Sequence, residues 1–252
     1  MRMITLLLLA LALLWPPPAA AARVEEGSFV SEGKTRRYAL YVPAGLPAGA
    51  GDRLPLVVVF HRSRSAGAAI VAKWRKTADD NGLVIAGPDA LDRGYGFDLP
   101  GDGPALLRDL FQTLSQRLPL DPRRIYLFGD WDGAAHVQIL ALLESEYVAA
   151  AAGHGGVLQP GNYEWMKVAR RKIPFSVQAG NQDVSLRLEV VRGMEERLRG
   201  AGFPVEVQVL RGHQNWYDDL APRINRRAWE FLRQHTLPAD PIYNEIQFEV
   251  QR

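Results

Sequence analysis

The sequence contains no cysteine in its 252 residues, and this absence excludes several kinds of chemistry. The protein has no disulfide framework and no thiol nucleophile, and it offers no cysteine for lipid attachment. No spacing of His, Asp and Glu is typical of a metal site, and no glycine-rich loop after a strand has the spacing that binds phosphate. The sequence therefore predicts neither a metal nor a cofactor.

An excess of charge of either sign is also missing. The 30 Lys and Arg residues nearly balance the 28 Asp and Glu residues, and basic residues cluster no further than pairs such as Arg36-Arg37. A nucleic-acid-binding surface normally needs a basic patch, so we expect no nucleic-acid partner. Repeats and linkers are lacking as well, and 47% apolar residues suffice for a large core. One α/β domain of this length is therefore expected.

The first 22 residues differ in composition from the rest of the chain. Arg2 precedes an apolar run from Ile4 to Trp15, which is followed by three prolines and then by alanines 19–22. A charged start, a short apolar region and small residues are typical of a secretory signal peptide. The run is short for a membrane span, which needs about 20 residues, although a retained anchor is the alternative. We expect residues 1–22 to be removed from a secreted or periplasmic protein that then has no membrane span.

Apolar runs and helical stripes alternate along the remaining chain. Residues Leu54–Phe60 include no charged residue, as expected of a strand buried on both faces, and the apolar residues of Pro104–Leu118 recur with helical spacing. Further strands are predicted at residues 35–42, 83–86, 125–128, 147–152, 175–179 and 205–210, and further helices at 68–80, 134–144, 186–199 and 220–234. This alternation predicts a mostly parallel sheet with helices on both faces, without a large cap, over residues 23–236, followed by a polar tail over 237–252.

One pentapeptide, Gly129-Asp130-Trp131-Asp132-Gly133, joins a predicted strand to a predicted helix. A strand, a sharp turn between small residues and a helix form the nucleophile elbow of an α/β-hydrolase, whose central residue is the nucleophile. Two polar loops at later strand ends contain Asp183 and His213, which gives the order nucleophile, acid and base found in this fold. We therefore expect Asp183 and His213 to be a residual acid and base.

Together with the strand that enters His61, the Gly87-Pro88-Asp89 turn and the segment 121–126, these loops resemble a known group of enzymes. They resemble the secreted polyhydroxybutyrate-depolymerase-like and feruloyl-esterase-like branch of the α/β-hydrolases. The resemblance covers about residues 35–236 by motif order. It implies an α/β-hydrolase fold and carboxylic-ester hydrolysis, with serine at position 131, a small residue at 132 and glycine at 62.

The sequence departs from that pattern at the chemically important positions. Trp131 replaces the nucleophile, and Asp132 and Arg62 stand on the two sides of the oxyanion hole. An indole offers only an N–H donor, and a carboxylate beside an oxyanion donor opposes the charge of the transition state. We therefore expect an exported homologue of carboxylic-ester hydrolases without serine-esterase activity, binding a small ester, an aromatic acid or a glycan.

Two other functions remain open from the sequence. The protein is either an active carboxylic-ester hydrolase with a non-standard nucleophile, or a secreted structural or interaction protein. Ser63 and Ser65 are candidate nucleophiles, and so is Asp130 if the elbow is shifted by one residue as in haloalkane dehalogenases. Structural roles are also open for several of these residues. Asp130 and Asp132 could cap the following helix, Asp183 could cap a turn, and Trp131 could fill the acyl pocket. A structural polar role is open for His61, His154 and His213.

Overall fold

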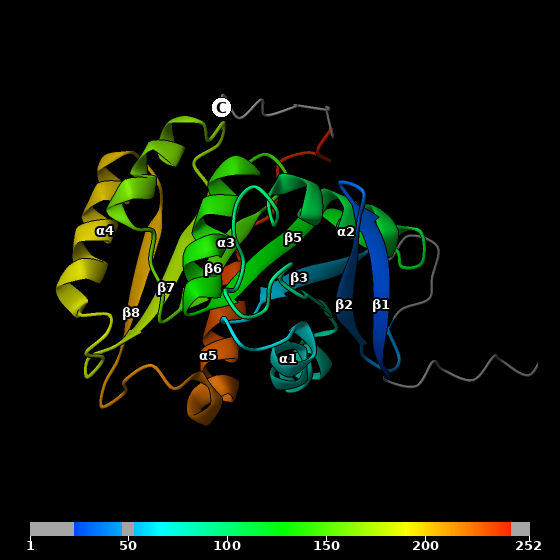
Figure 1. Ribbon diagram of the computed structural model, residues 1–252, viewed down its shortest axis with the longest axis horizontal. Helices are drawn as coiled ribbons and strands as arrows, with labels where there is room; N and C mark the ends of the chain where they lie inside the picture. The colour runs from blue at the N-terminus through cyan, green and yellow to red at the C-terminus, as the bar shows by residue number, and fades with distance from the viewer. Residues whose placement is uncertain (1–22, 47–52, 243–252) are drawn as a thin grey trace, which may run out of the picture.

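The computed structural model describes residues 23–46 and 53–242, which form one sheet flanked by helices (Figure 1). The predicted signal peptide and residues 243–252 of the predicted tail lie outside the described residues. Leu237, the first residue of that tail, is buried and donates its backbone N–H to the carbonyl of Arg123. Within the described ranges, each helix is too short or too polar to cross a membrane.

The sheet has eight strands in the order β1-β2-β4-β3-β5-β6-β7-β8. Their bounds are β1 Arg23–Ser31, β2 Lys34–Val42, β3 Leu54–Phe60, β4 Val84–Pro88, β5 Leu120–Asp130, β6 Ala150–His154, β7 Phe175–Gly180 and β8 Val205–Leu210. The pairs β1–β2 and β2–β4 are antiparallel, and every other neighbouring pair is parallel. The predicted mostly parallel sheet is confirmed.

Helices cover both faces of the sheet. They are α1 Gly67–Asn81, α2 Pro104–Ser115, α3 Asp132–Leu143, α4 Leu188–Gly200 and α5 Tyr217–Leu232, with a 3₁₀ helix η1 at Pro160–Lys167. Figure 1 shows α1 and α5 together on the lower side of the sheet. Apolar residues of α1 and α5 belong to one core cluster and those of α2, α3 and α4 to another, so the sheet separates two cores.

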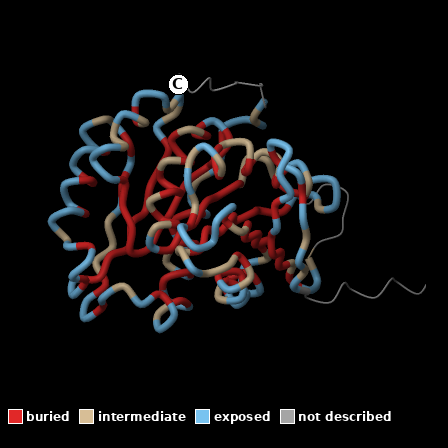
Figure 2. Tube along the Cα trace, viewed as in Figure 1, coloured by how far each residue is buried: buried red, intermediate tan, exposed pale blue. Residues whose placement is uncertain are grey.

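Strand β3 shows why the sheet lies between two cores. All seven of its residues are buried, and Figure 2 shows the same burial along the neighbouring strands. Val58 packs in the cluster of α2, α3 and α4, whereas Val57 and Val59 pack in the cluster of α1 and α5. Successive side chains point to opposite faces of a strand, so an unbroken apolar run supplies both cores at once. Each fully buried Val contributes about 1.5–3 kcal/mol.

The boundaries of some elements differ from those predicted because of local hydrogen bonds. Strand β6 begins at Ala150 rather than at Tyr147, because the backbone N–H groups of Tyr147 and Val148 bond back to the carbonyl of Glu144 at the end of α3. Helix α1 ends at Asn81, one residue after the predicted end, and is capped by Gly82, whose positive φ of 64° is a conformation that glycine adopts readily.

Candidate functional site

The turn between β5 and α3 has the strained backbone of a nucleophile elbow. Trp131 forms the turn with φ 55° and ψ −118°, which is unusual for a bulky residue. Close glycine contacts hold it: a Cβ atom on Gly129 would lie 2.3 Å from the carbonyl oxygen of Gly133, and one on Gly156 would lie 1.8 Å from that of Trp131. The turn therefore has the backbone conformation expected of an elbow, with an indole at its apex.

The indole of Trp131 does not fill an acyl pocket, so that interpretation is wrong. The residue is 39% exposed, and the guanidinium carbon of Arg62 lies 5.9 Å from the ring centroid. This distance is typical of a cation–π contact, which contributes about 0.5–1 kcal/mol at an exposed site. A positive φ directs the side chain out of the turn, and Arg62 then covers one side of the ring.

Asp132 blocks the region where an oxyanion would bind. Both of its carboxylate oxygens lie 2.9 Å from the backbone nitrogen of Ser63, in the loop after β3. In this fold one oxyanion donor comes from that loop and the other from the residue after the nucleophile. Gly96 packs over the same carboxylate, because a Cβ atom on it would lie 2.4 Å from Oδ2. Asp132 therefore puts negative charge on an expected oxyanion donor.

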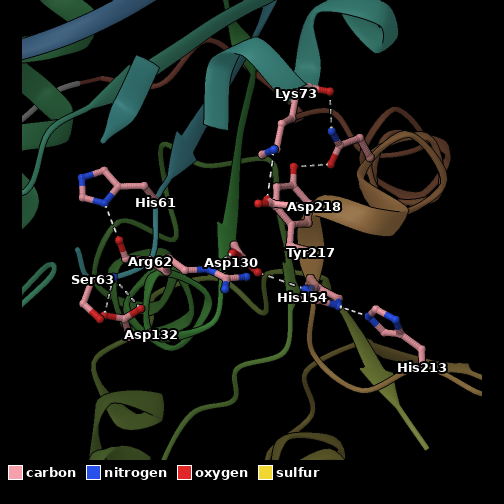
Figure 3. A network of polar contacts seen from close by, with 11 residues as sticks. His61, Arg62, Ser63, Lys73, Asp130, Asp132, His154, His213, Tyr217 and Asp218 are labelled. Carbon is pink, nitrogen blue, oxygen red and sulfur yellow. Dashed lines mark hydrogen bonds and ion pairs between the residues drawn. The ribbon is translucent and has the colours of Figure 1, made fainter. Parts of the chain in front are cut away.

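Asp130 belongs to a chain of buried polar side chains (Figure 3). Arg62 Nε donates to Asp130 Oδ2 at 2.7 Å, and Asp130 Oδ1 lies 3.0 Å from His154 Nδ1. His154 Nε2 in turn lies 3.0 Å from His213 Nε2. We call Arg62, Asp130, His154 and His213 the polar chain. Both oxygens of Asp130 are engaged in it, which argues against a shifted-elbow nucleophile.

The expected capping of α3 by Asp130 and Asp132 is wrong. Of the residues that the structure describes, none caps the N-terminus of α3 through a side-chain hydrogen bond. The carboxylate of Asp130 is turned toward Arg62 and His154, and that of Asp132 toward Ser63. Asp132 still places a negative charge in the first turn of α3, where the helix dipole favours it.

The two histidines of the polar chain share one proton. The carboxylate of Asp130 accepts from Nδ1 of His154, so in neutral His154 the Nε2 atom is an acceptor. The Nε2–H group of His213 then donates to it. Burial lowers the pKa of His213, the nearby His154 lowers it further, and Asp183 opposes this. His213 is therefore neutral at pH 7 and its Nε2 atom is already engaged.

Asp183 and His213 lie at the same edge of the sheet without being joined. Asp183 Oδ1 accepts from the backbone nitrogens of Ser185 and Leu186 at 2.8 and 2.9 Å, as a turn cap does. Its Oδ2 atom is buried and has no hydrogen-bond partner in the described parts of the chain. No hydrogen bond between Asp183 and His213 is found within residues 23–46 and 53–242. His213 is directed to His154 instead.

The place of His154 in this site is a finding of the structure, and both ring nitrogens of His61 are engaged in hydrogen bonds to the backbone. His154 ends β6, the strand beside β5, and its side chain is fully buried. The sequence pattern Gly153-His154-Gly155 at a strand end was the available indication. His61 donates from Nδ1 to the carbonyl of Arg62 and accepts from the N–H of Ala90 at Nε2. Burial lowers the pKa of His61, which keeps this acceptor available.

A pocket of about 170 Å³ lies beside Asp130, on the side of α1 and α5. Its walls come from the loop after β3, from α1, from the end of β5 and from the first turn of α5. The residues that line it are His61, Arg62, Ser65, Ala69, Ile70, Lys73, Asp130, Tyr217 and Asp218. Asp183 and His213 do not line it, so the open pocket lies elsewhere than expected. Drug-sized ligands usually occupy about 300–1,000 Å³, so this pocket suits a smaller molecule.

Comparison with known proteins identifies the fold. No protein-family model matches the sequence, and no curated protein sequence does. Among solved structures, a protein named as a dienelactone hydrolase from Klebsiella pneumoniae subsp. pneumoniae is 16% identical with a TM-score of 0.69, covering 85% of this chain and 100% of its own. The S-formylglutathione hydrolase of Agrobacterium tumefaciens is 17% identical with a TM-score of 0.66, covering 84% and 95%. A ferulic acid esterase is 13% identical with a TM-score of 0.65, covering 82% and 98%.

These likenesses, together with the sheet order and the elbow, define the class of the protein. The chain has the α/β-hydrolase fold in a single domain. At identities of 12–18% across such structures, the likeness concerns the fold. The function must therefore be argued from the side chains of this chain.

Proposed function

We propose that this protein is an exported α/β-hydrolase homologue, akin to the polyhydroxybutyrate-depolymerase-like and feruloyl-esterase-like esterases, that binds a small ligand without serine-esterase catalysis. One observation supports this above all: the elbow places Trp131 at its apex and the carboxylate of Asp132 on the backbone N–H of Ser63. The first removes the nucleophile and the second opposes the oxyanion.

The energetic argument is that three requirements of the serine mechanism are missing together. A lost oxyanion donor costs about 10²–10³ in rate, whereas a lost nucleophile removes the acyl-enzyme route itself. The base is affected as well, since Nε2 of His213 bonds to His154 instead of facing a nucleophile. Of the neighbouring hydroxyls, Ser65 lines the pocket beside Asp130, and no hydrogen bond between Ser65 and His213 is found within the described residues.

Reaction of the purified protein with a fluorophosphonate probe and with short-chain nitrophenyl esters tests this proposal. We expect no covalent labelling and no turnover above buffer, with His213→Ala indistinguishable from the parent protein. Stoichiometric labelling of Ser63 or Ser65, or turnover that His213→Ala abolishes, would support the alternative of an active carboxylic-ester hydrolase with a non-standard nucleophile.

Export is a separate part of the proposal. The composition of residues 1–22 supports cleavage that leaves a mature protein beginning near Ala22 or Arg23. The intact mass of the protein recovered from outside the cytoplasm tests it. Recovery from the membrane fraction with a mass that includes residues 1–20 would instead indicate a retained anchor.

A secreted structural or interaction protein is the remaining alternative. The open pocket beside Asp130 favours ligand binding over this alternative, since a purely structural descendant of an enzyme has no need of a pocket lined by charged groups. A small ester, an aromatic acid and a glycan are the ligand classes to test first.

A further inference from the structure

The pocket beside Asp130 is not lined by Asp183 or His213. It lies between α1 and the first turn of α5, and in Figure 3 Lys73 and Asp218 face it from one side and Arg62 from another. Lys73 Nζ and Asp218 Oδ1 are 3.0 Å apart, and the Asp218 side chain is 71% exposed. Such an exposed pair contributes about 0–1 kcal/mol, so Lys73 can exchange Asp218 for another anion at little cost.

Both carboxylate oxygens of Asp130 have hydrogen-bond donors, whereas Arg62 has a donor atom without an acceptor in the described part of the chain. Asp130 accepts from Arg62 and from His154, one donor on each oxygen. Arg62 donates from Nε alone, and its Nη2 atom is buried with no acceptor among the residues the structure describes. Leaving such a donor unsatisfied is costly, and a group of this kind in a folded protein calls for an explanation. The Arg62 side chain is 26% exposed, so a small movement of its guanidinium would bring an Nη group to an anion in the pocket.

Two helix N-termini lie beside the pocket. Helix α1 begins at Gly67 and α5 at Tyr217, both beside the pocket, and in the described chain the residue before each start, Ala66 or Trp216, makes no side-chain cap hydrogen bond. The N–H of Gly67 bonds to Asp89, and Asp218 and Asp219 lie in the first turn of α5, so part of the positive potential of these N-termini is compensated. The dipoles support anion binding here without defining the site alone.

The remaining walls are apolar and set the shape of the ligand. Ala69 and Ile70 line one wall, and the ring of Tyr217 lines another. The hydroxyl of Tyr217 donates to Asn225 at 2.6 Å, so its hydrogen is committed elsewhere. Both ring nitrogens of His61 are also engaged. The ligand therefore needs an anionic end for Arg62 and a small apolar body.

We infer that this pocket binds a small organic monocarboxylate, such as a short-chain acid or a single-ring aromatic acid. Its carboxylate accepts from an Nη group of Arg62 and pairs with Lys73, while its body packs against Ala69, Ile70 and Tyr217. This inference rests on the proposed ligand-binding function and assigns it a ligand class and a place. A carboxylate fits better than a dianion, because Asp130 and Asp218 also line the pocket.

Calorimetric titration of the purified protein with benzoate and butyrate tests the inference, with benzamide and methyl butyrate as neutral analogues. A hydrogen bond to a charged group is worth about 1.5–3 kcal/mol, so we expect the acids to bind about tenfold to a hundredfold more tightly than the neutral analogues. Equal binding of acids and neutral analogues would overturn the carboxylate assignment and leave the ligand-binding proposal standing.

Variants locate the site. Ala69→Leu fills the pocket without changing its charges, and Arg62→Gln removes the charge while leaving a donor for Asp130. Each should weaken benzoate binding at least about tenfold.

Arg93→Gln, at an exposed arginine in a neighbouring loop, is the matched control and should bind like the parent. Unchanged binding in a folded Ala69→Leu variant, or no binding of any acid by the parent protein, would overturn the inference. Fluorophosphonate labelling reports separately on the absence of esterase activity.

Discussion

Trp131 is strained in its backbone and exposed in its side chain, which makes its removal inexpensive. Losing a buried Trp costs about 3–5 kcal/mol, but Trp131 keeps 39% of its surface exposed. We expect Trp131→Ser to lower the free energy of unfolding by about 1 kcal/mol, near the value of its contact with Arg62. Urea denaturation measures it, with Trp74→Ser as the control because Trp74 is fully buried. Equal losses in the two variants would contradict this prediction.

Glu144 is a buried carboxyl group at the end of α3, and burial raises its pKa from 4.5 to about 7. The folded protein then binds a proton between these values that the unfolded chain has released, so this group lowers stability as pH rises from about 4.5 to about 7. The shift corresponds to about 3 kcal/mol. Glu144→Gln should therefore be more stable than the parent at pH 8, by up to about that amount, with a much smaller gain at pH 5.

Chemical denaturation at the two pH values measures this difference. Glu164→Gln is the control, because Glu164 is exposed and should change little at either pH. A gain for Glu144→Gln of the same size at both pH values would contradict the prediction, since an effect of ionisation must disappear where the carboxyl group is protonated.

At the scale of elements, the elbow and the loop after β8 together decide whether esterase activity can be restored. Trp131→Ser with Asp132→Ala supplies a nucleophile and frees the N–H of Ser63. We nevertheless expect no turnover, because Nε2 of His213 remains bonded to His154. Adding His154→Phe releases His213 and should give measurable hydrolysis of nitrophenyl acetate.

Two comparisons make this prediction specific. The variant that keeps Asp132 should be slower than the triple variant by about 10²–10³, the usual effect of an oxyanion donor. Arg62 is retained throughout, because it is a hydrogen-bond partner of buried Asp130. A folded triple variant without any activity would show that Asp183 and His213 are not a surviving acid–base pair.

Elements buried on both faces were predictable, whereas those defined by a partner were not. The run at β3 was predicted to the residue because burial on both faces required apolar side chains there. The edge strand β8 was also predicted to the residue, from apolar residues that alternate with Glu206 and Gln208. Strand β1 contains Glu25 and Glu26 beside Gly27, and it exists because it pairs antiparallel with β2, so its own pattern gave no indication.

The sequence predicted at which strand ends the site residues lie, but it did not predict which side chains contact one another. The elbow could be placed from Gly129 and Gly133, because those glycines are required by the close approach of its backbone. The direction of His213 depends on His154, which lies 59 positions away and competes with Asp183 for the imidazole. The exposure of Trp131 likewise follows from a positive φ that no composition rule gives.

For the whole molecule, buried histidines make stability depend on pH. Burial is the main cause that lowers the pKa of His61, His136, His213 and His235. The unfolded chain then binds more protons than the folded protein below about pH 6.5, the ordinary value for histidine. Their contribution is complete above that pH and is lost progressively as the pH falls through the lowered values, opposite in sign to that of Glu144.

We therefore expect the free energy of unfolding to decrease as pH falls from about 6.5 toward 5. His136→Gln should flatten this dependence by up to about 1.4 kcal/mol per pH unit, the limit for one group. Denaturation curves across this range, compared by slope, measure the effect. A slope that is the same in the parent and the variant would show that His136 does not contribute.

The glycine contacts that hold the elbow have a practical consequence. Because Gly129 and Gly156 pack closely on the backbone of the turn, we expect the turn to keep its conformation with another side chain at residue 131. The chain has no cysteine, so Trp131→Cys would introduce a unique thiol, at a half-exposed position directly before α3. The fold thereby offers a single attachment point for a fluorophore or spin label, at the edge of the sheet where every parallel strand ends.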